Sequence, residues 1–301
     1  MSTATQAVTP ERVLLRLEWK VIRRLDGLLQ GDYRTLFYGF GVDFADLREY
    51  QLNDDIRYID WNVTARMNTP YVRQYHEDRE VTAWFLLDMS PSVDFGTVRA
   101  GGEKRAMLID FTAVLARLLT RHGNRVGAMM YGNGIQHRVP ARGGRVQVLR
   151  LVNDMLKQPR LPRAPFTNLK TFLEEALYSI KRRSLIFLVS DFISAPGWEY
   201  PLSLLNRKHE VLAVRLWDPR EMELPDMGII LMEDAETGEQ LIVDTHDRKL
   251  RQRFYEAAKR REAELQEAFK RAAVDVLSLS TEDDLVRSIV RFTKQRAMRR
   301  H

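Results

Sequence analysis

Short apolar runs alternate with longer amphipathic stretches along most of the chain. Three runs, at 81–87, 184–189 and 210–217, are rich in bulky side chains and bounded by turn-forming residues, which is typical of strands buried on both faces of a sheet. Apolar positions at three- and four-residue steps predict helices over 103–122, 145–157, 169–180, 200–206 and 247–272. Strands that alternate with helices predict an α/β fold: a doubly wound, mostly parallel sheet with helices on both faces.

Shorter elements complete the predicted order. They are a helix from Pro10, a helical turn near 60–67, a strand over 71–75, hairpins at 124–139 and 228–244, a strand over 274–279, and a final helix capped by Ser280 or Thr281. We therefore expect three regions. Residues 1–10 form a disordered tail, 11–80 form an N-terminal helix with a β-rich extension, and 81–301 form the α/β domain, with a hairpin insertion near 228–244.

Composition excludes several classes of protein. The chain has 301 residues, of which 45% are hydrophobic, so it can bury a sizeable core. It has no cysteine, which rules out disulfides, thiol catalysis and Cys-based zinc sites. No run approaches the length of a membrane-spanning helix, and the N-terminus lacks a signal pattern. We expect a cytoplasmic protein without a membrane span.

Net charge is +6, and most basic and acidic residues are interleaved. The exception is the stretch 287–300, which holds six basic residues and no acid. One interpretation is a solvated helix face whose cations suit the negative end of the helix dipole. The other is a patch for nucleic acid or an acidic partner. The first is favoured, because no interleaved pattern of aromatic residues and no nucleic-acid motif accompanies the stretch.

Oxygen-bearing side chains follow two of the predicted strands. Asp88, Ser90 and Ser92 stand at two-residue spacing after the first apolar run, Asp191 follows the second, and a Pro-flanked loop between them presents Thr167. Ligands gather at the carboxyl ends of strands in an open parallel sheet. Carboxylate and hydroxyl oxygens suit Mg²⁺ or Mn²⁺. Asp-x-Ser-x-Ser alone is a weak signal, because Asp and Ser also begin turns, but three such loops converging on one point are far more specific.

A second group of residues lies upstream of the first apolar run. The segment is dense in charged and aromatic residues, and buried charges must pair. We expect a network within the set Asp55, Arg57, Asp60, Trp61 and Arg66. It either fastens this segment to the next domain or binds a partner.

These motifs resemble two known groups of proteins. The three loops resemble the metal-ion-dependent adhesion site of the von Willebrand factor A fold. The upstream run resembles the bacterial family called domain of unknown function 58, over roughly residues 12–300. The motifs that carry this likeness are GDY at 31–33, GFGVDF at 39–44, LREY at 47–50, DDIRYIDW at 54–61 and TAR at 64–66. Asn53 and Val93 depart from the family's usual Gly and Met, and neither is a ligand.

The resemblance implies a metal site and a partner. Asp88, Ser90, Ser92, Thr167 and Asp191 would hold Mg²⁺ (or Mn²⁺ or Ca²⁺), with Thr171 as the alternative to Thr167. It also implies a cytoplasmic adaptor or chaperone-like partner of MoxR-type AAA+ ATPases, which binds a partner carboxylate at an open metal position.

The competing class is a metal-dependent phosphatase or hydrolase that uses the same site. No His or Lys lies close to the metal loops in sequence to serve as acid or base, and the six histidines are scattered. The nucleophile-elbow, phosphate-loop and zinc-protease motifs are absent. We therefore expect a non-enzymatic binding module. Nucleic-acid binding through the basic stretch is a third class, with a steep salt dependence as its signature.

Overall fold

The computed structural model describes residues 9–28, 46–51, 54, 56, 59, 61–67, 69–74, 81–96, 103–161, 167–234 and 237–299. Its strands are β1 (Asp46–Glu49), β2 (Tyr71–Gln74), β3 (Thr82–Asp88), β4 (Arg125–Tyr131), β5 (Ile135–Arg142), β6 (Leu185–Ser190), β7 (Glu210–Trp217), β8 (Ile229–Glu233), β9 (Gln240–Asp244) and β10 (Asp275–Ser280).

The α-helices are α1 (Pro10–Leu17), α2 (Arg23–Leu28), α4 (Trp61–Met67), α5 (Lys104–Arg121), α6 (Gly144–Lys157), α7 (Leu169–Ser179), α8 (Glu199–Lys208), α9 (Arg248–Ala272) and α10 (Leu285–Arg299). A π-helical turn, η1 (Glu18–Ile22), joins α1 to α2, and short 3₁₀ helices occur at η3 (Pro91–Asp94) and η5 (Pro219–Glu221). None of the described helices is long and apolar enough to cross a membrane.

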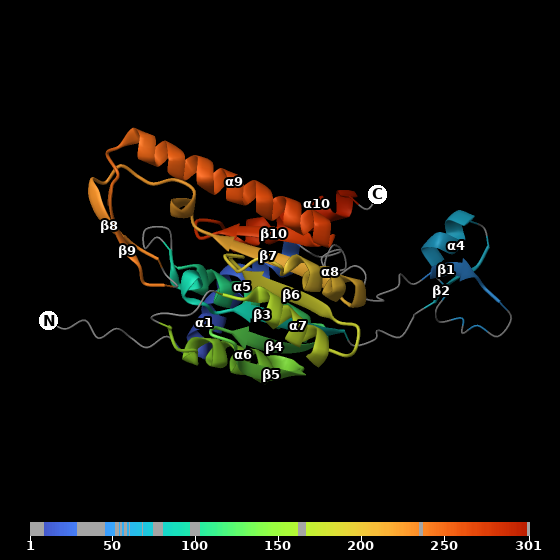
Figure 1. The fold of residues 1–301 in the computed structure, drawn as a ribbon. Coiled ribbons are helices and arrows are strands. Elements are labelled where there is room, and N and C mark those ends of the chain that lie inside the picture. The colour runs from blue at the N-terminus through green and yellow to red at the C-terminus, as the bar shows by residue number, and fades with distance from the viewer. Residues whose placement is uncertain are drawn as a thin grey trace.

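Six strands form the main sheet in the order β10-β7-β6-β3-β4-β5, and all neighbours are parallel except β4 and β5 (Figure 1). Strand β6, which is wholly buried, and strand β3, which is buried apart from the half-buried Thr82 and Trp84, lie at its centre, as expected for strands with apolar side chains on both faces. The predicted fold class, a doubly wound and mostly parallel sheet, is confirmed.

Helices cover both faces of this sheet. One hydrophobic core joins the sheet to α1, α5, α6 and α10, and the other joins it to α7, α8 and α9. Val13, Leu14 and Leu17 of α1 belong to the first core, so the N-terminal helix packs as part of the α/β domain. The hairpin β8–β9 and the two-stranded pair β1–β2 lie outside the six-stranded sheet.

The chain reverses direction across the sheet between β3 and β6. From β3 it proceeds through α5 to β4, whereas β6 leads through α8 to β7 on the opposite side. The crevice at the carboxyl ends of β3 and β6 is therefore the topological switch point, where open α/β sheets bind ligands. Both strands end at this point in the polar residues that the sequence singled out.

One predicted helix cap was wrong. Asp284 caps α10, because its Oδ1 accepts a hydrogen bond from the Arg287 backbone N–H at 2.9 Å. Thr281 is instead turned toward the loop after β7, where its hydroxyl donates to Asp218 Oδ2 at 2.7 Å. The Ser280 hydroxyl accepts from the Glu282 backbone N–H. Asp, Ser and Thr all suit a cap, so local sequence did not separate them.

Candidate metal-binding site

Asp88 is held at the end of β3 by hydrogen bonds from two loops. Its Oδ1 accepts from the Ser90 backbone N–H at 3.0 Å, and its Oδ2 accepts from the Ser190 hydroxyl at 2.6 Å. All three residues are fully buried. Ser190 ends β6, the strand beside β3. It therefore ties the two strands together at the switch point, a role that sequence reasoning missed.

The surroundings of Asp88 penalise its negative charge. The pKa of Asp88 is raised from 3.8 to about 6, first by burial and then by the neighbouring charge of Asp191, against the lowering effect of hydrogen bonds from Ser190 and Ser90. An anion that lacks enough compensating charge gains from a nearby cation. Asp88 and Asp191 thus lie close enough for each negative charge to affect the other.

Ser90 and Ser92 present their hydroxyls side by side. The two Oγ atoms are 3.1 Å apart, and both residues are buried. Ser90 stands at the N-cap position of the 3₁₀ helix η3, and Ser92 lies within its first turn. Asp94 at the end of this turn receives two hydrogen bonds from one guanidinium nitrogen of Arg105, at 2.8 and 3.0 Å. That ion pair fixes the loop to α5.

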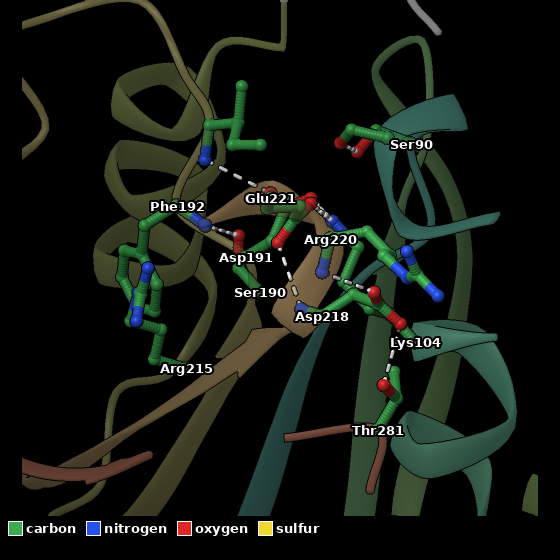
Figure 2. A network of polar contacts seen from close by, with 12 residues as sticks. Ser90, Lys104, Ser190, Asp191, Phe192, Arg215, Asp218, Arg220, Glu221 and Thr281 are labelled. Carbon is green, nitrogen blue, oxygen red and sulfur yellow. Dashed lines mark hydrogen bonds and ion pairs between the residues drawn. The ribbon is translucent and has the colours of Figure 1, made fainter. Parts of the chain in front are cut away.

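Lys104 enters the site from the first turn of α5, although it is far from Asp191 in sequence. Its Nζ lies 2.7 Å from Asp191 Oδ2 and 2.5 Å from Glu221 Oε1, and its side chain is wholly buried (Figure 2). Burial alone lowers the pKa of Lys104, but Asp191 and Glu221 more than offset this and raise it above its ordinary value. The ammonium is therefore charged at neutral pH.

Lys104 was the residue that sequence reasoning most clearly missed. No lysine was expected near the metal loops, because none is close to them in the sequence. In the folded chain Lys104 contacts Asp191, because α5 begins beside the loop that carries Asp191. One signal was available. Lys104 precedes Leu108, Phe111 and Leu115 on the buried stripe of α5, at helical spacing. A lysine on an apolar stripe needs a buried partner.

Glu221 reaches the site from the loop after β7. A capping box fixes it, because the Asp218 backbone N–H donates to Glu221 Oε2 at 3.0 Å while Asp218 Oδ1 accepts from the Arg220 N–H. Thr281, from the end of β10, holds the other oxygen of Asp218. A third strand end thus supplies a carboxylate that local sequence did not mark.

Asp191 is oriented by a strained residue that follows it. Its Oδ1 accepts from the Ile193 backbone N–H at 3.0 Å. Phe192, between them, has φ 60°, a left-handed conformation that non-glycine residues seldom adopt. Its ring is packed against Trp198 and Phe269, with centroids 5.4 and 4.7 Å away. We infer that this packing maintains the turn.

Thr167 lies beside the Asp191 loop and is buried, whereas Thr171 is exposed. The Thr167 carbonyl accepts from the Ala195 backbone N–H and from the Ser194 hydroxyl, each at 2.9 Å. The next backbone N–H, of Asn168, donates to the Tyr131 hydroxyl at 3.1 Å. The structure thus places Thr167 against the loop that follows Asp191 and leaves Thr171 exposed on α7.

The residues at the switch point fit a divalent cation. Asp88, Asp191 and the half-buried Glu221 carry three negative charges against the one positive charge of Lys104, so the cluster has a net charge of −2. Hydroxyl and carboxylate oxygens are the ligands that Mg²⁺ prefers. Among the described residues, this cluster included, no three His, Cys, Asp or Glu side chains are placed so that they could hold a metal ion by themselves. An ion here would therefore depend on the serine and threonine hydroxyls.

The upstream network remains a prediction. Asp55, Arg57 and Asp60 lie outside the described residues. Of the other two members, Trp61 is 69% exposed and Arg66 is also exposed. These two side chains are placed for contact with solvent or a partner.

The sheet and its switch point define a von Willebrand factor A-like α/β domain. The model of the family described as "Protein of unknown function DUF58" matches residues 46–264, and the chain belongs to this family. An uncharacterised protein of Mycobacterium tuberculosis is 36% identical over 285 residues, which cover 94% of this chain and 88% of that protein. The predicted family is confirmed.

Solved structures share the fold at low identity. An aerotolerance-related membrane protein from Bacteroides fragilis is 14% identical, with a TM-score of 0.50 over 73% of this chain and 99% of that one. The von Willebrand A domain of an Rpn10 protein is 12% identical, with a TM-score of 0.39 over 70% of this chain and 94% of that one. At 14% identity the likeness to the Bacteroides protein concerns the fold alone, and the weaker Rpn10 match supports no further conclusion.

Proposed function

We propose that this chain is a non-enzymatic protein-interaction module that binds a partner's carboxylate through Mg²⁺ held at the switch point. The observation that carries the proposal is the set of carboxylate and hydroxyl oxygens at the switch point, which together with the Lys104 ammonium has a net charge of −2. Ser90, Ser92 and Thr167 would supply neutral oxygens, and Asp88 and Asp191 the compensating charge. When bound, Mg²⁺ supplies a positive charge that attracts a carboxylate in a contact of low dielectric.

Lys104 supports binding rather than turnover. A general base must be able to accept a proton at the working pH, whereas two carboxylates raise the pKa of this ammonium. Asp191 is likewise engaged, with one oxygen on the Ile193 N–H and the other on Lys104. Both groups are held in place by the fold, which favours a rigid docking point.

We propose a MoxR-type AAA+ ATPase as the partner and the cytoplasm as the compartment. The support for both is the family resemblance, together with the absence of a membrane-spanning helix among the described residues. An acidic side chain on a surface loop of the ATPase would complete the metal's coordination.

A pull-down with the MoxR-type ATPase encoded by the same genome tests the proposal. We expect retention in Mg²⁺, loss in chelator, and loss with Ser90→Ala plus Ser92→Ala. The matched control is Ser179→Ala plus Ser203→Ala, on helices α7 and α8 away from the metal loops, and it should retain the ATPase. Retention by the Ser90/Ser92 variant and in chelator alike would contradict the role of the metal site.

An activity assay separates this function from the hydrolase alternative. We expect no Mg²⁺-dependent hydrolysis of p-nitrophenyl phosphate or ATP by the purified chain. Turnover that Asp88→Ala abolishes would make the site catalytic, with protonated Lys104 placed to stabilise an anionic transition state.

A further inference from the structure

The flank of the domain formed by α2 and α10 carries a second surface, separate from the metal site. A groove of about 460 Å³ lies there, more than twice the volume of the pocket beside Asp191, about 190 Å³. Its lining holds four basic residues and no acid: Arg24, Arg287, Arg291 and Lys294. This is the basic stretch that the sequence analysis singled out and that the proposed function does not use.

The arrangement of the cations on α10 is not explained by the helix itself. Arg287, Arg291 and Lys294 follow one another at four- and three-residue steps, so they lie on one face. Arg287 stands in the first turn, where the positive end of the helix dipole disfavours a cation. All three are exposed, and none forms an ion pair with another described residue. Helix stability therefore does not account for them.

A contrast on the same helix strengthens the point. Arg296 is only 6% exposed and forms ion pairs with Glu210 and with Asp275, at 2.9 Å for the latter. This arginine thus has a structural role between α10, β7 and β10. Among the described residues, the cations of the groove form no such ion pairs, apart from Arg24, which lies 3.7 Å from the exposed Asp284.

The floor of the groove is apolar. Val286 and Val290 lie between the basic side chains, and Met298, at the far end, is 71% exposed. The basic residues at the edges of the groove would pair with the acidic side chains of a bound segment, and the apolar floor would contact its bulky apolar side chains. Single-stranded nucleic acid would call for aromatic residues on which bases stack, and the lining has none. Because the groove is concave, a flat lipid surface would contact its rim and not its apolar floor.

We propose that the groove between α2 and α10 binds an acidic, amphipathic segment of a partner protein. Carboxylates of the segment pair with Arg287, Arg291 and Lys294, while its apolar side chains cover Val290 and Met298. Because this surface contains no metal ligand, binding here does not require Mg²⁺. A failure of this binding proposal can therefore be told apart from a failure of the proposed metal site.

Fluorescence anisotropy with labelled peptides tests the proposal on the full-length protein. The probe is an amphipathic peptide of Leu, Glu and Ala. Matched peptides replace every Glu by Gln or every Leu by Ser. We expect the Glu/Leu peptide to bind at least about tenfold more tightly than either, a difference of about 1.4 kcal/mol. Equal binding of the Gln peptide, or of the Ser peptide, would overturn the proposal.

Charge-reversal variants locate the site. Arg287→Glu plus Arg291→Glu should weaken binding of the Glu/Leu peptide by about tenfold or more, with no effect of chelator. The matched control is Lys249→Glu plus Arg253→Glu, an exposed pair on α9 with the same change in net charge, and it should bind within about twofold of wild type. An equal loss in both variants would mean that only net charge matters and would refute the groove. Tighter binding to duplex DNA or to phosphatidylserine vesicles than to the peptide would also refute it.

Discussion

Lys104 Nζ lies 2.7 Å from Asp191 Oδ2, so a carboxylate expected to serve a metal is already paired with a buried internal cation. The pair leaves the cluster with a net charge of −2, because Asp88 and Glu221 contribute two further carboxylates. The charge of Lys104 therefore sets how strongly the site attracts a divalent ion. Lys104 can be substituted while every predicted metal ligand keeps its own side chain.

Lys104→Met should destabilise the metal-free protein and tighten Mg²⁺ binding. Removing one partner of a buried ion pair costs roughly 3–5 kcal/mol, which chemical denaturation in chelator will show. The same change makes the cluster more negative, so calorimetric titration should give a lower Kd for Mg²⁺ where the variant is folded. Lys181→Met, on the surface beside Tyr178, serves as the control and should leave both quantities unchanged. Weaker Mg²⁺ binding by the Lys104 variant would contradict the electrostatic account.

Asp88→Asn should stabilise the metal-free protein at neutral pH. The native pKa of Asp88 is raised from 3.8 to about 6, so its ionised form costs stability above that range. Asn keeps an oxygen for the Ser90 N–H and removes the charge, for a gain of about 1–3 kcal/mol. With the sign worked out, the gain is absent below pH 4, grows between pH 4 and 6, and stays constant above. Urea denaturation at several pH values will check it, and a gain independent of pH would count against this explanation.

Millimolar Mg²⁺ should raise the melting temperature of wild type. A ligand that binds only the folded state stabilises it by mass action. Ser90→Ala plus Ser92→Ala should show no shift, because it removes neutral ligands and keeps both acids. Differential scanning fluorimetry in Mg²⁺ and in EDTA gives the measurement, with Ser179→Ala plus Ser203→Ala as the control. Equal shifts in all three proteins would place the ion elsewhere.

We expect the protein to lose stability in mild acid, where His209 becomes protonated on unfolding. Its side chain is 3% exposed. Burial, with a smaller contribution from Lys208, lowers its pKa from 6.5 to about 4. A histidine held neutral in the folded state contributes its full stability above pH 6.5 and loses it as pH falls toward 4.

The variant His209→Gln isolates this effect. Relative to it, wild type should lose roughly 3 kcal/mol of unfolding free energy between pH 6.5 and 4. His122→Gln, at an exposed position, should follow wild type across this range. A constant difference between wild type and His209→Gln would show that the imidazole titrates normally.

The amino-acid sequence by itself determined the order of the elements and the chemistry of the loops. Buried strands and amphipathic helices leave a periodic pattern within a few residues, so β3, β6 and α5 were predictable within one or two residues at each end. Asp88, Ser90 and Ser92 were predictable for the same reason, because a strand end and the hydroxyls after it are local features. The family likeness rested on contiguous motifs.

Only the tertiary structure decided which groups meet at the switch point. Lys104 and Asp191 are 87 residues apart, and Ser190 and Asp88 are 102 residues apart. No short-range pattern records such pairs, because they depend on which strands become neighbours and on where α5 begins. The left-handed turn at Phe192 likewise depends on packing against Trp198, which precedes α8, and Phe269 of α9. Backbone propensity favours the predicted elements, but long-range packing and the pairing of buried charges select the site.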